Sequence, residues 1–225
     1  MLKFLGRLPS IAAVLALIGT TAGHASLLVP GTTAPPDVFP SITGTQLALL
    51  TSTFASVLPG DFSGTYTTEV IRDPANVFCA NCLDFIYQAT NNGPHDIVTV
   101  STSSFTGFFT DAGITSSVTA GGTSLTSAGD IFPSSVTRRS TGSTVNFEFV
   151  VPPLFGAGKT TAVLVVETNA TEFTTGHVSF INEGTSTNNA FQPVQPIPEP
   201  ASLALFGTAL AGLGMLRRRR RRKNA

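Results

Sequence analysis

Apolar and polar residues alternate with a period of two along several stretches of the chain. Residues 83–90, 144–151 and 177–180 place aliphatic or aromatic residues at every second position, with mostly polar residues between them. This alternation is typical of β-strands that bury one face and expose the other. Residues 162–166 are continuously apolar instead, which predicts a central strand buried on both faces.

The rest of the pattern predicts turns rather than helices. Residues 91–94, Asn-Asn-Gly-Pro, favour a turn, and residues 152–158 are expected to join two strands as a hairpin loop. Outside the chain ends, only residues 46–52 suit a short helix. We therefore predict an all-β fold over residues 46–191, an antiparallel β-sandwich with an immunoglobulin-like or jelly-roll-like arrangement. Residues 26–45 contain four prolines and are expected to form an extended segment ahead of this domain.

The first 25 residues have the three parts of a secretory signal peptide. Lys3 and Arg7 supply positive charge, residues 11–18 form a short apolar run, and small residues follow. Because these parts occur in the order that export requires, we predict a signal helix and cleavage between Ala25 and Ser26. A buried N-terminal helix is the competing interpretation.

The chain ends in an apolar run followed by a block of basic residues. Residues 192–200 form a proline-rich spacer, and residues 201–216 carry no charge. As a helix, the apolar run would be roughly 24 Å long, against a hydrocarbon core of about 30 Å, and arginine side chains reaching toward the interface make up the difference. We predict a transmembrane helix at 201–216 and a basic cytoplasmic tail at 217–225. The stop-transfer cluster consists of Arg217, Arg218, Arg219, Arg220, Arg221, Arg222 and Lys223.

Charge is distributed unevenly along the chain. All 13 acidic residues lie between Asp37 and Glu199, whereas only four of the 13 basic residues lie there. Phosphate contacts need clustered Lys and Arg, so the body is not expected to bind nucleic acid. The basic block at the end adjoins an apolar run and has no aromatic residues among its arginines. This favours a membrane anchor over a nucleic-acid patch.

The C-terminal pattern resembles a known sorting signal. Pro198-Glu199-Pro200, an uncharged helix and an arginine cluster follow one another without a gap, and this order resembles the PEP-CTERM signal of Gram-negative bacteria. The resemblance implies recognition by exosortase, a membrane-embedded cysteine transpeptidase-like enzyme, which removes the tail. It also implies a periplasmic body held at the inner membrane before processing, and release or transfer to the cell surface or extracellular matrix afterwards.

The resemblance also implies partners. These are exosortase, and then exopolysaccharide or other matrix components, because the family is associated with bacteria that produce exopolysaccharide and form biofilms or flocs. Signal peptidase and the export machinery are partners expected from the N-terminal signal peptide. Residues 84–88, 105–113 and 161–168 resemble β-rich bodies often found ahead of such tails, and that likeness implies no catalytic residues.

Cys79 and Cys82 are the only cysteines. A zinc site would need two further ligands, and a thioredoxin-like redox site would need a βαβ context, so neither is expected. Since the export signal leads to an oxidising compartment, the pair is a possible disulfide.

No catalytic or metal site emerges from the other polar residues. His95 and His177 lack a nucleophile signature nearby and are expected at the surface. Asp61, Asp96, Asp111 and Asp130 lie near turn residues and have no calcium-loop spacing, so they are interpreted as turn formers. Asn169-Ala170-Thr171 fits the N-glycosylation pattern, which in a bacterium we take to be coincidental. We expect no cofactor.

Three hypotheses about function remain open at this point. The first is a non-enzymatic surface or matrix protein, structural or adhesive. The second is a secreted carbohydrate-binding module or hydrolase, which a carboxylate pair or a histidine–acid pair in one cleft would favour. The third is a periplasmic protein anchored permanently by its own tail.

Overall fold

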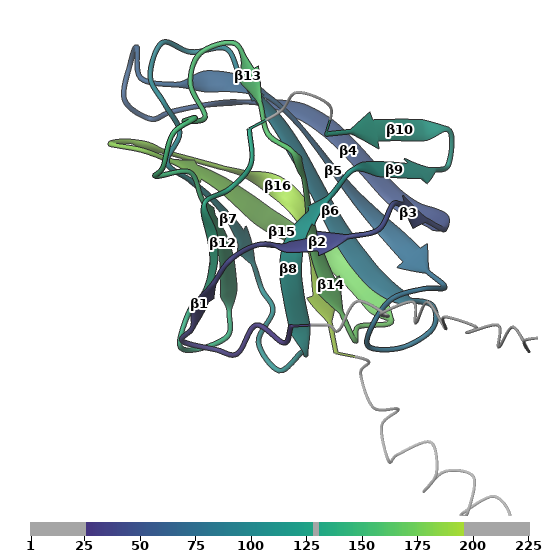
Figure 1. The fold of residues 1–225 in the computed structure, drawn as a ribbon. Helices are drawn as coiled ribbons and strands as arrows, with labels where there is room; N and C mark the ends of the chain where they lie inside the picture. Colours follow the sequence, from purple (N-terminus) through teal and green to yellow (C-terminus); the bar gives the residue numbers. More distant parts are fainter. Residues whose placement is uncertain (1–25, 128–130, 196–225) are drawn as a thin grey trace, which may run out of the picture.

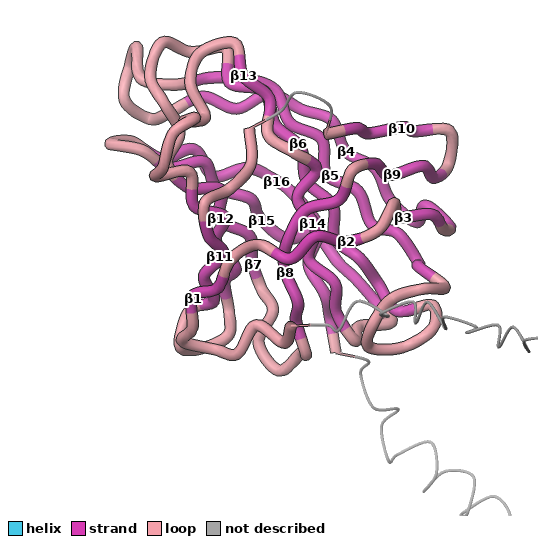
Figure 2. The backbone as a smooth tube through the Cα atoms, in the orientation of Figure 1, coloured by secondary structure: helices cyan, strands magenta, loops and turns pink. Residues whose placement is uncertain are grey.

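The computed structural model describes residues 26–127 and 131–195. Within these residues the fold is all-β, with three sheets and no helix (Figures 1 and 2). The strands are β1 (Thr33–Ala34), β2 (Asp37–Phe39), β3 (Ile42–Thr43), β4 (Thr45–Ala55), β5 (Ser63–Asp73), β6 (Cys82–Asn91), β7 (Thr99–Ser103), β8 (Thr110–Thr115), β9 (Ser117–Ala120), β10 (Thr123–Thr126), β11 (Ser135–Arg138), β12 (Thr144–Glu148), β13 (Lys159–Thr160), β14 (Val163–Thr168), β15 (Glu172–Ile181) and β16 (Thr185–Val194).

Two large sheets make up most of this fold. One has six strands in the order β1-β11-β12-β7-β15-β16. The other has seven, six of them in the order β2-β8-β14-β6-β5-β4, with the short strand β13 also pairing with β6. Strand neighbours are mostly antiparallel, as predicted, but β2 pairs with β8 and β3 with β9 in parallel. The expectation of a wholly antiparallel arrangement is therefore wrong at these two short pairs.

A single hydrophobic core lies between the two large sheets. The ring of Phe54 on β4 stacks on Phe180 of β15, with ring centroids 3.9 Å apart. The hydroxyl of Tyr66 on β5 donates across the interface to the carbonyl oxygen of Asn189 on β16, at 2.7 Å. The alternation of residues 83–90 is explained by this core, because the apolar side chains of β6 point into it. They are Leu83, Phe85, Tyr87 and Ala89.

A third, smaller sheet gives the seven-stranded sheet a second buried face. It has the order β10-β9-β3, and Val118 of β9 packs with Ile86 of β6 and with Val163 and Val165 of β14 in a second cluster. Strand β14 lies between β8 and β6 and is buried along its whole length. The prediction of a central strand buried on both faces at residues 162–166 is thus confirmed.

Residues 26–45 were expected to be an extended segment outside the domain, but the structure places them within the sheets. They contribute β1, β2 and β3, and Leu28 lies in the main core. The proline-rich sequence keeps the segment extended, and an extended segment has main-chain groups free to pair with an existing edge. Gly113 allows β2 to pair closely, because a Cβ there would collide with the carbonyl oxygen of Asp37.

Two further local expectations are also wrong. Residues 46–52 form part of the long strand β4 rather than a helix, because they pair along β5 with a bulge between Gln46 and Ala48. Residues 152–158 do not close a hairpin, since β12 belongs to the six-stranded sheet and β14 to the seven-stranded sheet. This loop instead crosses between the layers, and Phe155 pairs with Ile97 on the way.

The predicted signal helix at residues 1–25 and transmembrane helix at 201–216 lie outside the described residues. In the part of the chain that the structure does describe, no helix has the length and apolar character needed to cross a bilayer.

Candidate functional site

The sorting segment adjoins the end of the folded domain. Strand β16 ends at Val194, and the described chain ends at Gln195. Residues 192–194, predicted as the start of the spacer, belong to this strand, where Pro193 faces Phe173 of β15. Pro198, Glu199 and Pro200 lie outside the described residues, as do the basic cluster at 217–223 and Ala25 on one side of the predicted signal cleavage.

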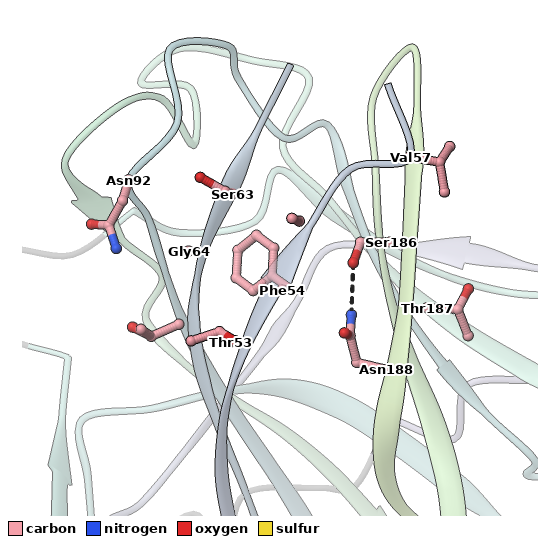
Figure 3. Close-up of a pocket in the computed structure, with 11 residues that line it drawn as sticks. Thr53, Phe54, Val57, Ser63, Gly64, Asn92, Ser186, Thr187 and Asn188 are labelled. Carbon is pink, nitrogen blue, oxygen red and sulfur yellow. Dashed lines mark hydrogen bonds between the residues drawn. The ribbon is translucent and has the colours of Figure 1, made fainter. Parts of the chain in front are cut away.

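An open groove of about 600 Å³ lies between the free edges of the two large sheets (Figure 3). Strand β4 is the edge of the seven-stranded sheet and β16 the edge of the six-stranded sheet. They approach each other here, with the Val57 nitrogen donating to the Thr185 carbonyl oxygen at 3.1 Å. We call this the edge groove, and it is lined by Thr53, Phe54, Ala55, Val57, Ser63, Gly64, Thr65, Asn92, Ser186, Thr187 and Asn188.

The edge groove offers hydroxyl and amide groups. Figure 3 shows Thr53 and Ser63 on one side and Ser186, Thr187 and Asn188 on the other, with the Asn188 amide donating to the Ser186 hydroxyl at 3.0 Å. No lining residue carries a carboxylate, an imidazole, an amine or a thiol. The groove can therefore form hydrogen bonds with a polar ligand, but these side chains do not exchange protons near neutral pH.

A histidine–acid contact lies close to the groove but not among its lining residues. Asp61 Oδ1 is 3.9 Å from His95 Nδ1, and Asp61 Oδ2 accepts a hydrogen bond from the Ser56 hydroxyl at 2.8 Å. The carboxylate thus stands between serine and histidine, whereas in a hydrolytic triad the histidine stands between the other two. His95 and His177 are both exposed, in agreement with the prediction.

A disulfide joins Cys79, in the loop between β5 and β6, to Cys82, the first residue of β6, with Cα atoms 5.4 Å apart. We call residues 74–81 the β5–β6 loop. Its tight path includes Asn81 with a positive φ of 68°, a conformation that asparagine adopts more readily than most residues. The Asn76 side chain fixes the loop from inside, because its Oδ1 accepts hydrogen bonds from the Phe78 and Cys79 nitrogens.

A row of five carboxylates crosses the outer face of the seven-stranded sheet beside this loop. Five neighbouring strands, β2, β8, β14, β6 and β5, each contribute one residue, and in that order they are Asp37, Asp111, Glu167, Asp84 and Asp73. Glu167 is directly opposite both Asp84 and Asp111 in the strand register. We call this set the carboxylate row.

Burial raises the pKa of three members of the carboxylate row. Desolvation, followed by the charge of Asp37, raises the pKa of Asp111 to about 8. Desolvation chiefly raises the pKa of Glu167 to about 7. Desolvation, followed by the charges of Glu167 and Asp73, raises the pKa of Asp84 well above its ordinary value. Each raised pKa reflects the cost of placing a negative charge away from water and near like charges.

The interpretation of all four singled-out aspartates as turn formers holds only in part. Asp61 lies in the β4–β5 connection, where it also accepts a hydrogen bond from the Gly184 nitrogen, and Asp96 lies in the loop before β7. Asp111 is buried within β8 and is not a turn residue. Asp130 lies outside the described residues.

Sequence reasoning missed both the edge groove and the carboxylate row. The signal for the row was present in the alternation, since Asp84 and Glu167 fall on the side of their strands that carries Ile86 and Val165. An acidic residue on an otherwise apolar strand face is expected to be buried, and a buried carboxylate is rare unless a partner compensates its charge. The groove had no such signal, because its serine, threonine and asparagine residues resemble those of any exposed strand edge.

Comparison with known proteins identifies the C-terminal segment. A family model described as the PEP-CTERM protein-sorting motif matches residues 196–221. This confirms the resemblance read from the sequence and supports exosortase-dependent sorting of an exported protein in Gram-negative bacteria. No curated protein and no solved structure matches the chain, so the immunoglobulin-like or jelly-roll-like character stays a prediction.

Proposed function

We propose that this chain is an exported, non-enzymatic protein of the cell surface or extracellular matrix, released from the inner membrane when an exosortase removes its tail. The observation that carries the proposal is the sorting motif at residues 196–221. It follows directly on Gln195, the residue after the last strand. A folded β domain thus stands immediately ahead of the segment that the processing enzyme recognises.

In this proposal the body is carried into the periplasm by the signal peptide and held there by the apolar run at 201–216. The basic cluster stays on the cytoplasmic side. The prolines of the spacer are expected to favour an extended chain between domain and membrane, which would give a membrane-bound enzyme access to it. After cleavage the domain moves to the surface or matrix, where exopolysaccharide is the partner we propose.

The chemistry of the edge groove and of the histidine–acid contact beside it supports a binding role rather than catalysis. The edge groove is lined by groups that donate and accept hydrogen bonds without titrating near neutral pH. The one histidine–acid contact among the described residues has the carboxylate, not the histidine, next to the serine hydroxyl. Neither arrangement supplies the general base that hydrolysis of a glycoside or ester requires.

The edge groove also favours a second, more specific function, the binding of a neutral saccharide. A sugar presents hydroxyl groups, and Thr53, Ser63, Thr187 and Asn188 present complementary hydroxyl and amide groups along one open trough. Tyr66 and Tyr87 are buried, so binding would depend on hydrogen bonds and not on stacking against tyrosine. The double variant Thr187→Ala, Asn188→Ala is expected to lose retention on host exopolysaccharide, while Thr175→Ala, elsewhere on the six-stranded sheet, is expected to keep it.

The sorting proposal is tested by intact mass and C-terminal peptide mapping of the mature protein from its native host. Loss of the residues beyond the Pro198–Pro200 region is the expected result, and an additional mass on the new C-terminus would identify an attached group. Pro198→Ala with Pro200→Ala is expected to leave the tail uncut, while Gln195→Ala is processed normally. A wild-type chain that still ends at Ala225 would refute processing and leave a periplasmic protein anchored by its own tail.

A further inference from the structure

Three members of the carboxylate row, Asp73, Asp84 and Glu167, converge on one point. One carboxylate oxygen from each lies within 4.8 Å of those of the other two. Oxygens that coordinate a common Ca²⁺ at about 2.3–2.6 Å are separated by no more than about twice that distance. The spacing is therefore that of ligands around a cation, although the three residues come from three different strands, β5, β6 and β14.

One oxygen of each carboxylate is already held by the β5–β6 loop. The Ala75 nitrogen donates to Asp73 Oδ1 at 2.8 Å, the Asn76 amide to Asp84 Oδ1 at 2.6 Å, and the Val77 nitrogen to Glu167 Oε2 at 3.4 Å. Three consecutive residues thus orient three carboxylates. Hydrogen bonds of this kind fix the ligands of a metal site while leaving the second oxygen of each available.

The second oxygen of Asp84 provides an independent indication of a missing partner. Asp84 has none of its surface exposed, and its Oδ2 accepts no hydrogen bond from any described residue. A buried carboxylate oxygen without a donor costs about 1–3 kcal/mol or more, and native proteins seldom leave one uncompensated. Asp84 stands between Asp73 and Glu167 in the row, so this unpartnered oxygen belongs to the middle ligand of the cluster.

Basic side chains do not compensate the cluster. Among the described residues, the only charged pair within 4.0 Å is His95 with Asp61, so neither lysine nor arginine neutralises Asp73, Asp84 or Glu167. Desolvation is the main cause of the raised pKa values of Asp84 and Glu167, and the charges of neighbouring carboxylates add to it. Some positive species is needed if the three groups are to ionise together.

We propose that Asp73, Asp84 and Glu167 form a binding site for a hard divalent cation of the Ca²⁺ type, with the β5–β6 loop holding the three carboxylates in place. The proposed ligands are carboxylate oxygens alone. Ca²⁺ prefers oxygen ligands, whereas softer metals favour nitrogen or sulfur ligands. Water would complete the coordination. The site depends on neither the tail nor the edge groove, so a test of cation binding is independent of a test of the proposed function.

The test is thermal unfolding of the exported full-length chain in a non-ionic detergent, after treatment with EDTA. At an affinity of about 10⁻⁴ M, common for extracellular calcium modules, 10 mM CaCl₂ is expected to raise the Tm by about 5–10 °C. NaCl at matched ionic strength controls for screening. Titration calorimetry with CaCl₂ is expected to give one site per chain.

Two isosteric variants and one control make the result decisive. Asp84→Asn is expected to abolish the Ca²⁺-dependent shift and to have a Tm in EDTA at or above that of the parent, because it removes a buried like charge. If Asp84→Asn does not fold, Glu167→Gln replaces it in the test and is likewise expected to abolish the Ca²⁺-dependent shift. Glu69→Gln replaces another buried carboxylate on the same face of β5 and is expected to keep the full shift. A parent Tm unchanged by CaCl₂, or an equal shift in Asp84→Asn, would overturn the site and show that the cluster is neutralised by protons.

Discussion

The main-chain nitrogen of Ser26 lies 3.1 Å from Asp111 Oδ2 and donates a hydrogen bond to it. The same nitrogen is 3.2 Å from Asp37 Oδ2. Ser26 is the residue that the predicted signal cleavage would make the first of the mature chain. Removal of the signal peptide would then turn this nitrogen into an ammonium group placed between Asp37 and Asp111, the first two carboxylates of the row.

We predict that correct signal cleavage stabilises the folded domain. A chain that begins at Ser26 is expected to be about 1 kcal/mol more stable than one that begins at Ala25. The extra residue moves the ammonium away from both carboxylates, and a charge pair with one exposed member, here Ser26, contributes modestly. The corresponding Tm difference is about 2–4 °C. N-terminal sequencing establishes where each chain starts, and thermal unfolding measures the difference. If Asp111→Asn leaves that difference intact, the contact is not its cause.

We predict a pH-dependent gain from Glu69→Gln. Burial raises the pKa of Glu69, and the hydrogen bond from the Gln46 amide only partly opposes this effect. A carboxyl whose pKa is raised in the folded state stabilises most below its unfolded pKa of about 4.3, and that contribution is lost as pH rises through the folded pKa. Urea midpoints of the variant are expected to exceed those of the parent at pH 8 and to converge with them near pH 4. A pH-independent difference would contradict this assignment.

We predict that the Cys79–Cys82 disulfide makes a modest contribution to stability and also supports cation binding. The cysteines are three positions apart in sequence, and closing so short a loop is worth about 2 kcal/mol in the chain-entropy description. The double variant Cys79→Ser, Cys82→Ser should lower the Tm by about 4–8 °C. It should also weaken the Ca²⁺-dependent shift, because the bonded loop positions the donors to the three carboxylates. An undiminished shift would show that the loop holds its shape without the bond.

We predict that Arg138→Lys is strongly destabilising. The Arg138 guanidinium is buried and donates to four carbonyl oxygens, those of Leu28, Phe105, Phe108 and Gly142. A lysine ammonium cannot reproduce this planar fork, and lost hydrogen bonds to a charged group cost about 1.5–3 kcal/mol each. The free energy of unfolding should fall by about 3 kcal/mol or more, as measured by urea denaturation. Arg139→Lys, at the exposed neighbouring position, is the matched control and should change it by less than about 0.5 kcal/mol.

The strands that were predicted correctly are those whose burial is reflected in the order of apolar and polar residues within the strand itself. Residues 83–90 alternate because one face of β6 packs on the six-stranded sheet, and residues 162–166 are continuously apolar because β14 is covered on both faces. The C-terminal motif could also be recognised from the sequence, because a basic cluster beside an apolar run consists of residues that are neighbours in the chain. Each of these features depends on residues within a short window.

Other features depended on partners far away in the sequence. Residues 26–45 are extended, as their prolines require, but only the pairing of β1 with β11 and of β2 with β8 makes them part of the sheets. The loop at 152–158 has the composition of a hairpin turn, yet the strands on its two sides belong to different sheets.

Two properties could be recognised from the amino-acid sequence alone, namely the C-terminal sorting motif and the β-strand character of the body. Those properties follow from local composition and period, which act before any long-range contact forms. Which polar residues come together depends on how the strands pair and pack in three dimensions. Asp73, Asp84 and Glu167 converge because strand register sets β5, β6 and β14 side by side. The edge groove exists because β4 and β16 end their sheets on the same side, a relationship between strands that no linear spacing encodes.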